Sequence, residues 1–340
     1  MTLEDQLRTG GASGATWAWR QGGHAASGGL GTLRDEPAAI FPIYSITKTL
    51  IAAAVLQRVA EGVLQLDAPL LDQLQLNGTP GWLSWRPFTL REVLNHTAGL
   101  PDYGGLPAYH EAVRLQPGEP WSAEELLERV APLPRPVGFA YSNIGYLLLR
   151  LLLEQLENQP LHRVLQRRLF EPLQLTHTRV AGTAADLAGL TPGHGRIWSA
   201  PHATAGLHGY HPGWVAHGLA LSTAPELARL VEGVFSGPLV PAHLRAALQT
   251  AVPVHVSHPV FTSPGYGLGV MLDTASGLAG HGGGGPGYGA GALWQPLAAD
   301  AGITAVALVN HDGSEAGLLL AHALIRQFTA LAAPATDGRR

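Results

Sequence analysis

The chain has no cysteine and few charged residues. Its 340 residues include no Cys, and Asp, Glu, Lys and Arg together make up only 14% of them. The missing cysteine excludes disulfide bonds, thiol nucleophiles and cysteine-ligated zinc. With 46% apolar residues, the composition is typical of a folded protein of one large or two modest domains rather than of a disordered chain. The net charge of -4 gives no basic excess, so we expect no nucleic-acid partner.

Long apolar runs are also missing. The leucine-rich stretch 147–153 is interrupted by Arg150 and ends at Glu154, well short of the roughly 20 residues that a membrane span requires. The segment Met1-Thr2-Leu3-Glu4-Asp5 carries acids where a signal peptide has a basic region before an apolar run. We therefore expect a cytoplasmic protein with no membrane span, although a chain that had lost a leader would begin in the same way.

The most informative motif is Ser45-Ile46-Thr47-Lys48. Apolar residues recur at steps of three and four over 51–59, in phase with Lys48, and Gly62 follows where a helix C-terminus is expected, so the pattern predicts a helix that begins near Ser45. Residues i and i+3 share one helix face, which brings an amine next to a hydroxyl that needs a base. The spacing therefore favours a nucleophilic serine, while an ordinary serine cap followed by a solvent-facing lysine has the same two residues.

A second group of polar residues is Tyr141-Ser142-Asn143, at a junction between a proline-rich loop and a predicted helix over 144–157. Tyr141 carries a hydroxyl that can lie near a reacting group, and Asn143 offers both a donor and an acceptor to a substrate amide. A helix cap with an aromatic neighbour that only packs would have the same sequence.

A third segment, 281–287, is a histidine followed by glycines. Glycine lets a substrate approach the main chain, and a strand there can donate an N–H group to an oxyanion. A turn-rich hairpin explains the same composition. The glycines also match G-x-G-x-x-G, but Pro286 and the strand-like 290–294 argue against the helix that a dinucleotide site needs. We expect no cofactor.

Other hydrolase signatures are absent. The chain has no G-x-S-x-G, and the stretch 110–114 lacks the last histidine of H-E-x-x-H. Several histidines gather in a Gly/Pro-rich stretch without the spacing of a metal site, so we expect solvated loop residues and no metal. These histidines are His194, His202, His208, His211 and His217.

The organisation along the chain predicts an α/β fold built from both chain ends. Short strands are expected in the first forty residues, and further strands at 266–272, 289–294 and 303–310. Helices are expected at 124–130, 144–157, 161–170, 224–235 and 315–330. We predict one α/β sheet domain formed by 1–65 and 195–335, a helical insert domain at 66–194, and a loose tail at 333–340.

In the order S-x-x-K, Y-S-N, H-G-G, the three motifs resemble the serine β-lactamase and penicillin-binding-protein superfamily, in its branch of class C β-lactamases, D-aminopeptidases and esterases. The likeness covers about residues 40–310, and it is most specific at 95–103. Further connecting segments that look like the family are 62–70, 90–103, 171–173 and 266–269. The resemblance implies a β-lactamase/transpeptidase-like α+β fold, an antiparallel sheet flanked by helices with an inserted, mainly helical domain.

The resemblance also implies roles for the motif residues. Ser45 would be the acylated nucleophile, Lys48 would help to remove its proton, and Tyr141 would act as or share the general base and acid. Which of Lys48 and Tyr141 takes the proton stays open. Asn143 would contact the substrate.

The third motif would contribute His281, Gly283 and Gly284 to the substrate and oxyanion contacts, with the N–H groups of Ser45 and Gly284 forming the oxyanion hole. Where the family usually has Lys-Thr-Gly, this chain has His281 in place of the lysine, and histidine is mostly neutral near pH 7. Good β-lactamase activity is therefore not expected.

We interpret the chain as a metal-independent serine hydrolase of small ester, amide or peptide substrates. The alternatives are a D-stereospecific peptidase or carboxypeptidase, a weak β-lactamase, or a penicillin-binding sensing module that does not turn over. The sequence leaves the substrate and the oligomeric state open.

Overall fold

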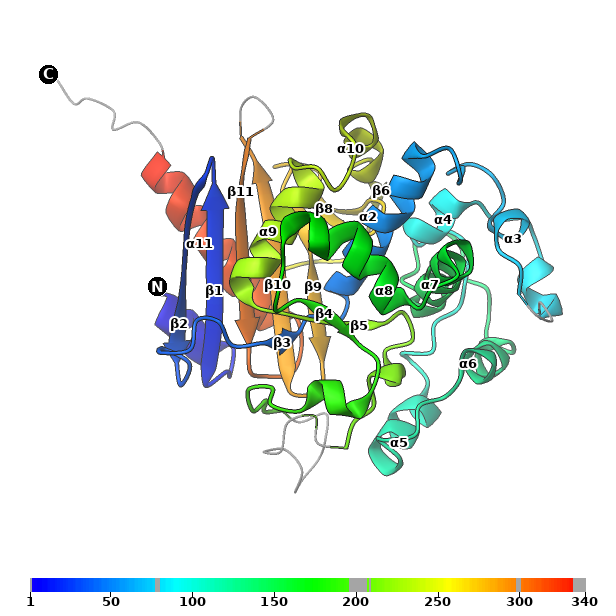
Figure 1. The fold of residues 1–340 in the computed structure, drawn as a ribbon, viewed down its shortest axis with the longest axis horizontal. Coiled ribbons are helices and arrows are strands. Elements are labelled where there is room, and N and C mark those ends of the chain that lie inside the picture. The colour runs from blue at the N-terminus through cyan, green and yellow to red at the C-terminus, as the bar shows by residue number, and fades with distance from the viewer. Residues whose placement is uncertain (1, 77–79, 196–206, 208, 298–300, 333–340) are drawn as a thin grey trace, which may run out of the picture.

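The computed structural model describes residues 2–76, 80–195, 207, 209–297 and 301–332. Its largest element is an eight-stranded antiparallel sheet in the order β2-β1-β11-β10-β9-β8-β7-β6 (Figure 1). The strands are β1 (Gly14–Gln21), β2 (His24–Gly31), β6 (Val252–Pro253), β7 (Pro264–Tyr266), β8 (Met271–Asp273), β9 (Ala279–Gly285), β10 (Tyr288–Pro296) and β11 (Gly302–Val309). Strands from both chain ends pair directly, since β1 lies between β2 and β11, which confirms the predicted fold class.

A second, three-stranded sheet lies next to the start of helix α2 (Ile46–Ala60). It consists of β3 (Phe41–Pro42), β4 (Arg179–Ala181) and β5 (Leu219–Ser222), in the order β3-β5-β4. Strand β3 ends just before α2, and β5 pairs with both of its neighbours. The small sheet thus joins the entry to α2 to segments that follow much later in the chain.

One face of the large sheet is covered by α11 (Glu315–Ala332), with α1 (Leu3–Thr9) beside it. Close approach depends on glycine, because a Cβ on Gly291 would lie 2.4 Å from the backbone of Gly317 in α11. The apolar layer between this face and α11 includes Leu293, Ile303, Val309, Leu318 and Leu324. Removal of this surface from water stabilises the joining of the two chain ends.

The opposite face is covered by α9 (Ala224–Phe235) and by the N-terminal part of α2. The residues of α2 from Ile46 to Leu56 are buried on all sides, so this helix runs through the centre of the molecule. The helix ends just before Gly62, the glycine predicted at its C-terminus, which has a φ of 73° and so takes the left-handed conformation common after helix ends.

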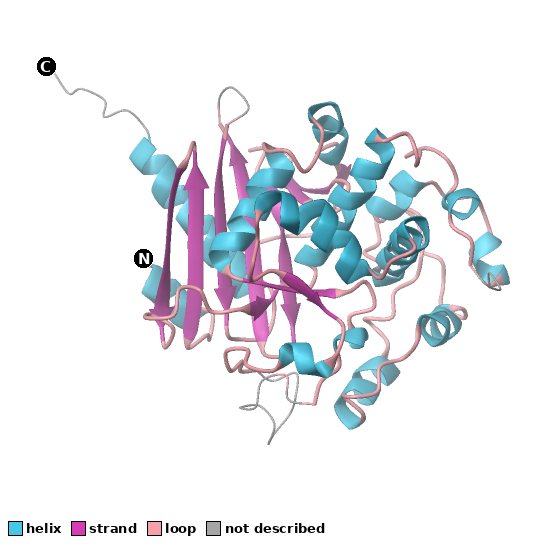
Figure 2. Cartoon of the chain, viewed as in Figure 1, coloured by secondary structure: helices cyan, strands magenta, loops and turns pink. Residues whose placement is uncertain are grey.

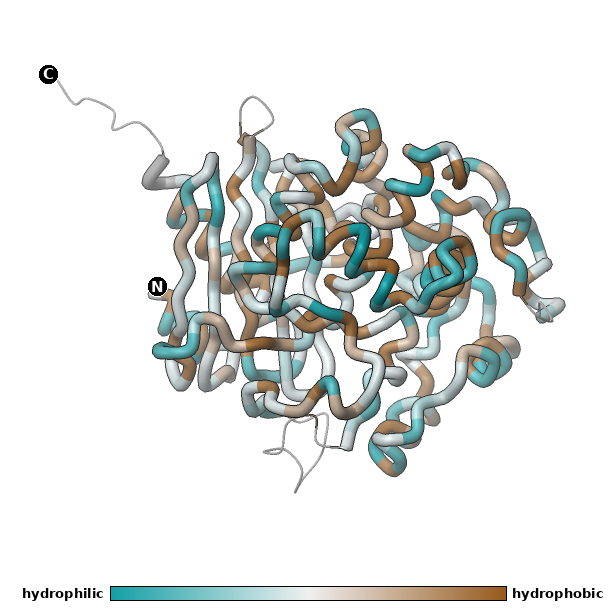
Figure 3. The backbone as a smooth tube through the Cα atoms, viewed as in Figure 1, coloured by the Kyte–Doolittle hydropathy of each residue, from teal (hydrophilic) through white to brown (hydrophobic). Residues whose placement is uncertain are grey.

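The helices between residues 66 and 170 form the other half of the molecule (Figure 2). Its α-helices are α3 (Leu70–Gln73), α4 (Leu90–Leu94), α5 (Pro107–Leu115), α6 (Ala123–Val130), α7 (Asn143–Glu157) and α8 (Leu161–Leu165). Helix α10 (Ala242–Leu248) lies apart from them, near α9 and the short strands of the large sheet (Figure 1). Short helical turns are η1 (Gly81–Ser84), η2 (Gln166–Phe170), η3 (Glu171–Leu173), η4 (Ala184–Leu187) and η5 (Pro212–Trp214). Figure 3 shows hydrophobic and hydrophilic segments alternating along these helices, as expected where one side packs on a core.

Most of the predicted elements are confirmed. The helices at 124–130, 144–157, 224–235 and 315–330 occur within one or two residues of their predicted ends, and 161–170 forms α8 followed by a π-helical turn. The predicted strand 266–272 is wrong, because the chain turns at Gly269 with a φ of 79° and splits it into β7 and β8. Thr49 of α2 donates to the Gly269 carbonyl over 2.7 Å and holds this turn.

The division of the chain into a sheet domain, formed by 1–65 and 195–335, and a helical insert domain at 66–194 stays a prediction. The tail 333–340 lies outside the described residues. Within the described part of the chain, no helix has the length and apolar content that crossing a bilayer requires.

Candidate active site

Ser45 stands at the N-terminus of α2, and its hydroxyl makes no capping hydrogen bond. The residue before it, Tyr44, has a φ of 43°, a conformation that a bulky side chain rarely adopts. Its ring hydroxyl donates to the Pro286 carbonyl over 2.8 Å and so fixes this bend. The helix start therefore presents the Ser45 hydroxyl at the positive end of the α2 dipole, without using it as a cap.

Lys48 lies one turn further along α2 and is fully buried. Its Nζ is 3.3 Å from Ser45 Oγ and donates to Asn143 Oδ1 over 2.7 Å. Burial lowers the pKa of Lys48 from 10.5 to about 7, although the Asp102 carboxylate acts in the opposite direction. A solvent-facing lysine is thereby excluded, and about half of the amines are neutral near pH 7.

Tyr141 reaches the same point from the loop before α7, and Asn143 reaches it from the first turn of that helix. Ser142 caps this helix by accepting from the Gly145 N–H over 3.2 Å. The centre of the Tyr141 ring lies 4.9 Å from Lys48 Nζ. Burial raises the pKa of Tyr141 well above 10, and its hydrogen bond with Ser45 offsets only part of that rise. Tyr141 is therefore a neutral phenol near pH 7.

Asp102 belongs to the site and was not among the residues that the sequence singled out. Its carboxylate accepts from the Asn143 backbone N–H over 2.7 Å and from Asn143 Nδ2 over 3.2 Å. These bonds fix the Asn143 amide with its oxygen toward Lys48. Burial raises the pKa of Asp102, and the Asn143 N–H and the Lys48 charge oppose that rise. The segment 95–103 was recognised as specific, but nothing in it marks Asp102 as a contact of Asn143.

The glycines of β9 lie against the start of α2. A Cβ on Gly283 would lie 2.1 Å from the Ile43 carbonyl oxygen and 3.4 Å from the Ser45 nitrogen, and one on Gly285 would overlap the Tyr44 ring. Only glycine allows the strand and the helix start to approach this closely. Gly284 and Gly285 line the cavity into which Ser45 opens.

His281 faces the interior rather than the cavity. Its Nε2 lies 2.9 Å from the Tyr266 hydroxyl and its Nδ1 lies 2.6 Å from the Gly282 carbonyl oxygen. Burial lowers the pKa of His281 to about 3, so the ring is neutral near pH 7. It is not among the described residues that line the cavity next to Ser45.

The histidine-rich stretch contains one residue that departs from the expectation of solvated loop histidines. His217 is 2% exposed, and both of its ring nitrogens lie 3.3 Å from Lys48 Nζ. His194 and His211 lie elsewhere, and His202 and His208 fall outside the described residues. Among the residues that the structure describes, no three His, Cys, Asp or Glu side chains form a group that could hold a metal ion.

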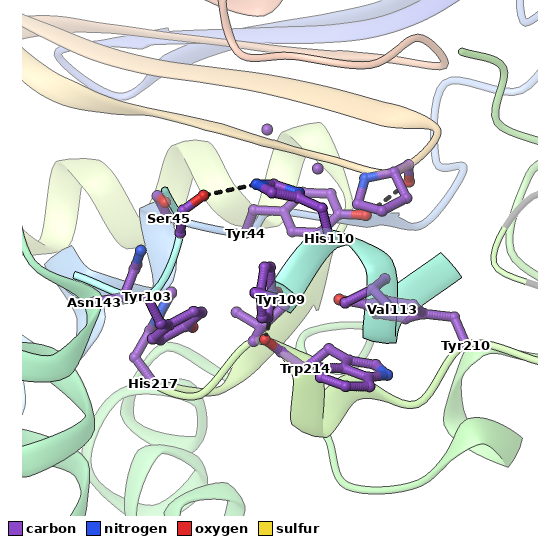
Figure 4. A pocket seen from close by; sticks show the side chains of 15 residues that line it. Tyr44, Ser45, Tyr103, Tyr109, His110, Val113, Asn143, Tyr210, Trp214 and His217 are labelled. Atoms are coloured by element: carbon purple, nitrogen blue, oxygen red, sulfur yellow. Dashed lines mark hydrogen bonds between the residues drawn. The ribbon is translucent and has the colours of Figure 1, made fainter. Parts of the chain in front are cut away.

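The cavity beside Ser45 has a volume of about 230 Å³. Figure 4 shows Ser45, Asn143 and His217 at one end and Tyr210 and Trp214 at the other. Among the described residues that line it there is no Asp, Glu, Lys or Arg. The cavity therefore offers a substrate mainly apolar and aromatic surface with a few polar groups near the serine.

The aromatic wall of the cavity is held by its own contacts. The ring of Tyr109 in α5 packs against the rings of Tyr103 and Trp214, with ring centres 4.9 Å and 5.6 Å apart. The Tyr109 hydroxyl donates to the Trp214 carbonyl over 2.9 Å, and Trp214 Nε1 donates to the Pro117 carbonyl over 2.9 Å. Because these polar atoms are paired within the wall, the rings present fixed apolar faces.

Comparison with known proteins places the chain in a family and a fold. The model of the Beta-lactamase family matches residues 2–330. A D-stereospecific amidohydrolase from Streptomyces sp. superposes with a TM-score of 0.75 and 26% identity over 92% of this chain and 94% of that one. D-amino acid amidase from Ochrobactrum anthropi SV3 superposes with a TM-score of 0.74 and is 20% identical, over 97% of this chain and 100% of that one.

A penicillin-binding protein of Bacillus subtilis (strain 168) is 26% identical over 147 residues, which are 42% of this chain and 31% of that protein. The chain thus spans about a third of the length of this curated relative. The penicillin-binding protein from Bacillus halodurans shares the fold, with a TM-score of 0.74 and 20% identity over 96% of this chain and all of that one.

Proposed function

The chain belongs to the beta-lactamase family, and we propose that it is a serine hydrolase that cleaves an ester or amide through an acyl-enzyme on Ser45. The observation that carries this proposal is the buried Lys48 amine, 3.3 Å from the Ser45 hydroxyl oxygen. A base so close to the hydroxyl is the arrangement that turns a serine into a nucleophile.

Lys48 takes the Ser45 proton in this proposal. With a pKa of about 7, its amine is substantially unprotonated at neutral pH, whereas the phenol of Tyr141 keeps its proton. Tyr141 then donates its proton to the departing alcohol or amine, and the Lys48 ammonium restores it. This division of roles follows from burial, which favours the neutral form of each group.

The developing oxyanion would lie between the start of α2 and strand β9. The Ser45 N–H lies at the start of α2, where the helix dipole favours negative charge. The glycines of β9 bring a second row of backbone N–H groups to the same place, with Gly284 lining the cavity. Two backbone donors at this position would stabilise the tetrahedral intermediate.

The substrate is proposed to have a bulky, apolar acyl group and no charge close to the scissile bond. The cavity has room for a side chain of aromatic size and is lined by Tyr103, Tyr109 and Trp214. The described residues of its lining include no Lys or Arg that would bind a carboxylate, which disfavours a carboxypeptidase or an efficient β-lactamase. The likeness to a D-stereospecific amidohydrolase supports an amide of a D-amino acid as a second candidate, which differs from the first by an ammonium group close to the scissile bond.

The test uses hydrolysis of p-nitrophenyl esters together with intact-protein mass spectrometry after reaction with a fluorophosphonate. Turnover and a single adduct are expected in the wild type, and both are lost in Ser45→Ala. An adduct without turnover of esters or of D- and L-amino acid amides would indicate a sensing module. Turnover that survives in Ser45→Ala would refute the proposal.

A further inference from the structure

His96 stands at the end of helix α4 in a conformation that its residue type rarely takes. The Thr97 N–H donates to the Glu92 carbonyl over 2.8 Å, and the His96 N–H donates to the Val93 carbonyl over 3.4 Å. This is the Schellman arrangement, in which the left-handed residue is usually glycine and sometimes asparagine. Here that residue is His96, with a φ of 61°. The helix end by itself therefore gives no reason for a histidine.

The side chain of His96 is also unfavourable where it lies. It is 3% exposed, and its Nε2 has no hydrogen-bond partner among the residues that the structure describes. A buried polar atom without a partner lowers stability, and so does a left-handed backbone at a residue with a bulky side chain. A residue retained in spite of both effects is expected to hold another part of the molecule in place.

The part that His96 holds is the segment that carries Tyr141. The carbonyl of His96 accepts from the Ala140 N–H over 2.9 Å, and its ring Nδ1 accepts from the Ser142 N–H over 3.1 Å. Between these two bonds, the Tyr141 ring packs on the His96 ring, with ring centres 4.4 Å apart. His96 therefore contacts the Tyr141 side chain directly and binds the backbone on both sides of it.

The ring of His96 accepts a hydrogen bond because it is neutral. Burial lowers the pKa of His96 well below 6.5, and the nearby charge of Lys48 lowers this pKa further. A neutral imidazole has one nitrogen that accepts and one that carries the proton. A backbone N–H such as that of Ser142 only donates, so Nδ1 is the accepting nitrogen and the proton is on Nε2.

A second residue of the same stretch also holds this segment. The Ser142 hydroxyl donates to the Pro101 carbonyl over 2.8 Å. Pro101 and His96 both belong to the stretch 95–103, where the likeness to the family is most specific. The backbone around Tyr141 is therefore fixed by this stretch as well as by the helix that follows it.

We propose that His96 is a positioning residue that holds Tyr141 with its hydroxyl toward Ser45 and the departing group. This inference rests on the proposed serine hydrolase function, in which Tyr141 donates a proton to the leaving group. Without the imidazole, the segment 140–142 loses one of its two bonds to His96, and the Tyr141 ring loses its packing. The phenol then spends less time in the geometry that proton transfer requires.

Two substitutions separate the ring acceptor from the rest of the side chain. Glycine and asparagine are the residues that suit a left-handed helix end, so neither His96→Gly nor His96→Asn strains the backbone. The asparagine Oδ1 is bonded to Cγ, as Nδ1 is in histidine, and it can accept from the Ser142 N–H. Both variants lack the ring, and only His96→Asn keeps the acceptor.

The experiment compares the p-nitrophenyl and ethyl esters of phenylacetic acid. Both give the same acyl-enzyme, and kcat/KM reports its formation. p-Nitrophenolate leaves without a proton, whereas ethoxide must be protonated as it leaves. We expect His96→Gly to lower kcat/KM about 10- to 100-fold for the ethyl ester, but at most about threefold for the p-nitrophenyl ester. His96→Asn should recover most of the ethyl ester rate.

A double-mutant cycle tests whether His96 acts through Tyr141. Tyr141→Phe should lower kcat/KM for the ethyl ester about 10²-fold, because the proton donor is lost. In this background, His96→Gly should lower it by at most about threefold more. A merely structural role of His96 would instead lower the rate by the same factor with and without the Tyr141 hydroxyl.

A matched control is available at another helix end. Asn158 has a φ of 46° at the C-terminus of α7, and it is not among the described residues that line the cavity beside Ser45. Asn158→Gly should keep both ester rates within about twofold of wild type, as expected for a substitution outside the site. A thermal melt of each variant checks that it is folded.

A replacement is available if His96→Gly does not fold. Glutamine takes a φ of 51° at Gln174, so His96→Gln suits the same backbone. The glutamine Oε1 lies one bond farther from the backbone than Nδ1 of histidine, so the acceptor is displaced from the Ser142 N–H. An ethyl ester rate as high in His96→Gln as in His96→Asn would overturn the inference.

The outcomes separate the two proposals. Wild-type protein that a fluorophosphonate does not label at Ser45 would refute the serine hydrolase. Labelled protein that cleaves only the p-nitrophenyl ester, or neither ester, would refute proton donation by Tyr141 and with it the role of His96. Equal losses for the two esters in His96→Gly, or the same loss in the Tyr141→Phe background, would refute the role of His96 and leave the hydrolase standing.

Discussion

Helices α2 and α11 pack near opposite faces of strand β9, and the two interfaces bury different chemistry. The layer under α11 is apolar, with fully buried leucine, isoleucine and valine side chains. Around the start of α2 the buried residues include Lys48, His96 and His217, beside a Tyr44 with positive φ. One strand of glycines thus separates an apolar layer that stabilises the fold from a layer that contains several buried ionisable groups.

The difference shows how the reactive groups obtain their properties. Burying an amine without a full complement of partners lowers stability, and the same burial brings the pKa of Lys48 to about 7. The apolar layer under α11 offsets such a loss, because burial of its surface stabilises the packing of the two chain ends. The comparison therefore predicts opposite responses to substitution on the two sides of β9.

The largest effect is expected from Lys48→Met. Labelling of Ser45 should fall by about 10³-fold or more, since the base is lost. The protein should become more stable at neutral pH by roughly 1–3 kcal/mol, since a buried amine is replaced by an apolar side chain of similar length. Labelling kinetics and thermal melts measure the two effects.

The sign of the pH effect on Lys48→Met can be stated as well. The pKa of Lys48 is lower in the folded state, so the unfolded chain binds more protons between about 7 and 10.5 and wild-type stability gains over that range as pH rises. The Met variant should lack this gain. A variant that melts below the wild type at pH 7 would contradict the comparison.

On the other side of the sheet, Leu324→Ala should lower the free energy of unfolding by about 2–5 kcal/mol, because Leu324 of α11 is fully buried between this helix and the sheet. Labelling of Ser45 well below the melting temperature should stay within about twofold of wild type. Chemical denaturation and labelling kinetics test this together. Slower labelling in folded Leu324→Ala would show that the two layers are coupled.

A smaller effect, which depends on the leaving group, is expected from Tyr141→Phe. Hydrolysis of an amide should fall about 10²-fold, because the amine must be protonated as it leaves. Labelling by a fluorophosphonate should change much less, since fluoride leaves without a proton. Equal losses in both reactions would instead give Tyr141 the role of base toward Ser45.

The sequence predicted those parts of the site that depend on local spacing. Ser45 and Lys48 share a helix turn, and Tyr141 and Asn143 precede a helix with clear periodicity, so their neighbourhoods follow from the sequence pattern. The helices and the sheet built from both chain ends were predicted for the same reason. The glycines of β9 were recognised as backbone that a partner can approach.

Asp102 and His217 were not predicted because their places in the site depend on contacts between distant segments. Asp102 acts through Asn143, 41 residues later, and His217 reaches Lys48 across 169 residues. Neither has a spacing that a sequence pattern reveals. The strand predicted at 266–272 failed for a similar reason, since the turn at Gly269 is held by Thr49 of α2.

The most direct test of the account is the pH dependence of Ser45 labelling in the wild-type protein, followed by intact mass. Because the neutral amine of Lys48 is the base, the rate should rise with pH, with a midpoint of about 7, and level off above it. A rate that still rises toward pH 10, as for an ordinary lysine, or one that does not change between pH 5 and 9, would contradict the claim that burial makes Lys48 the base.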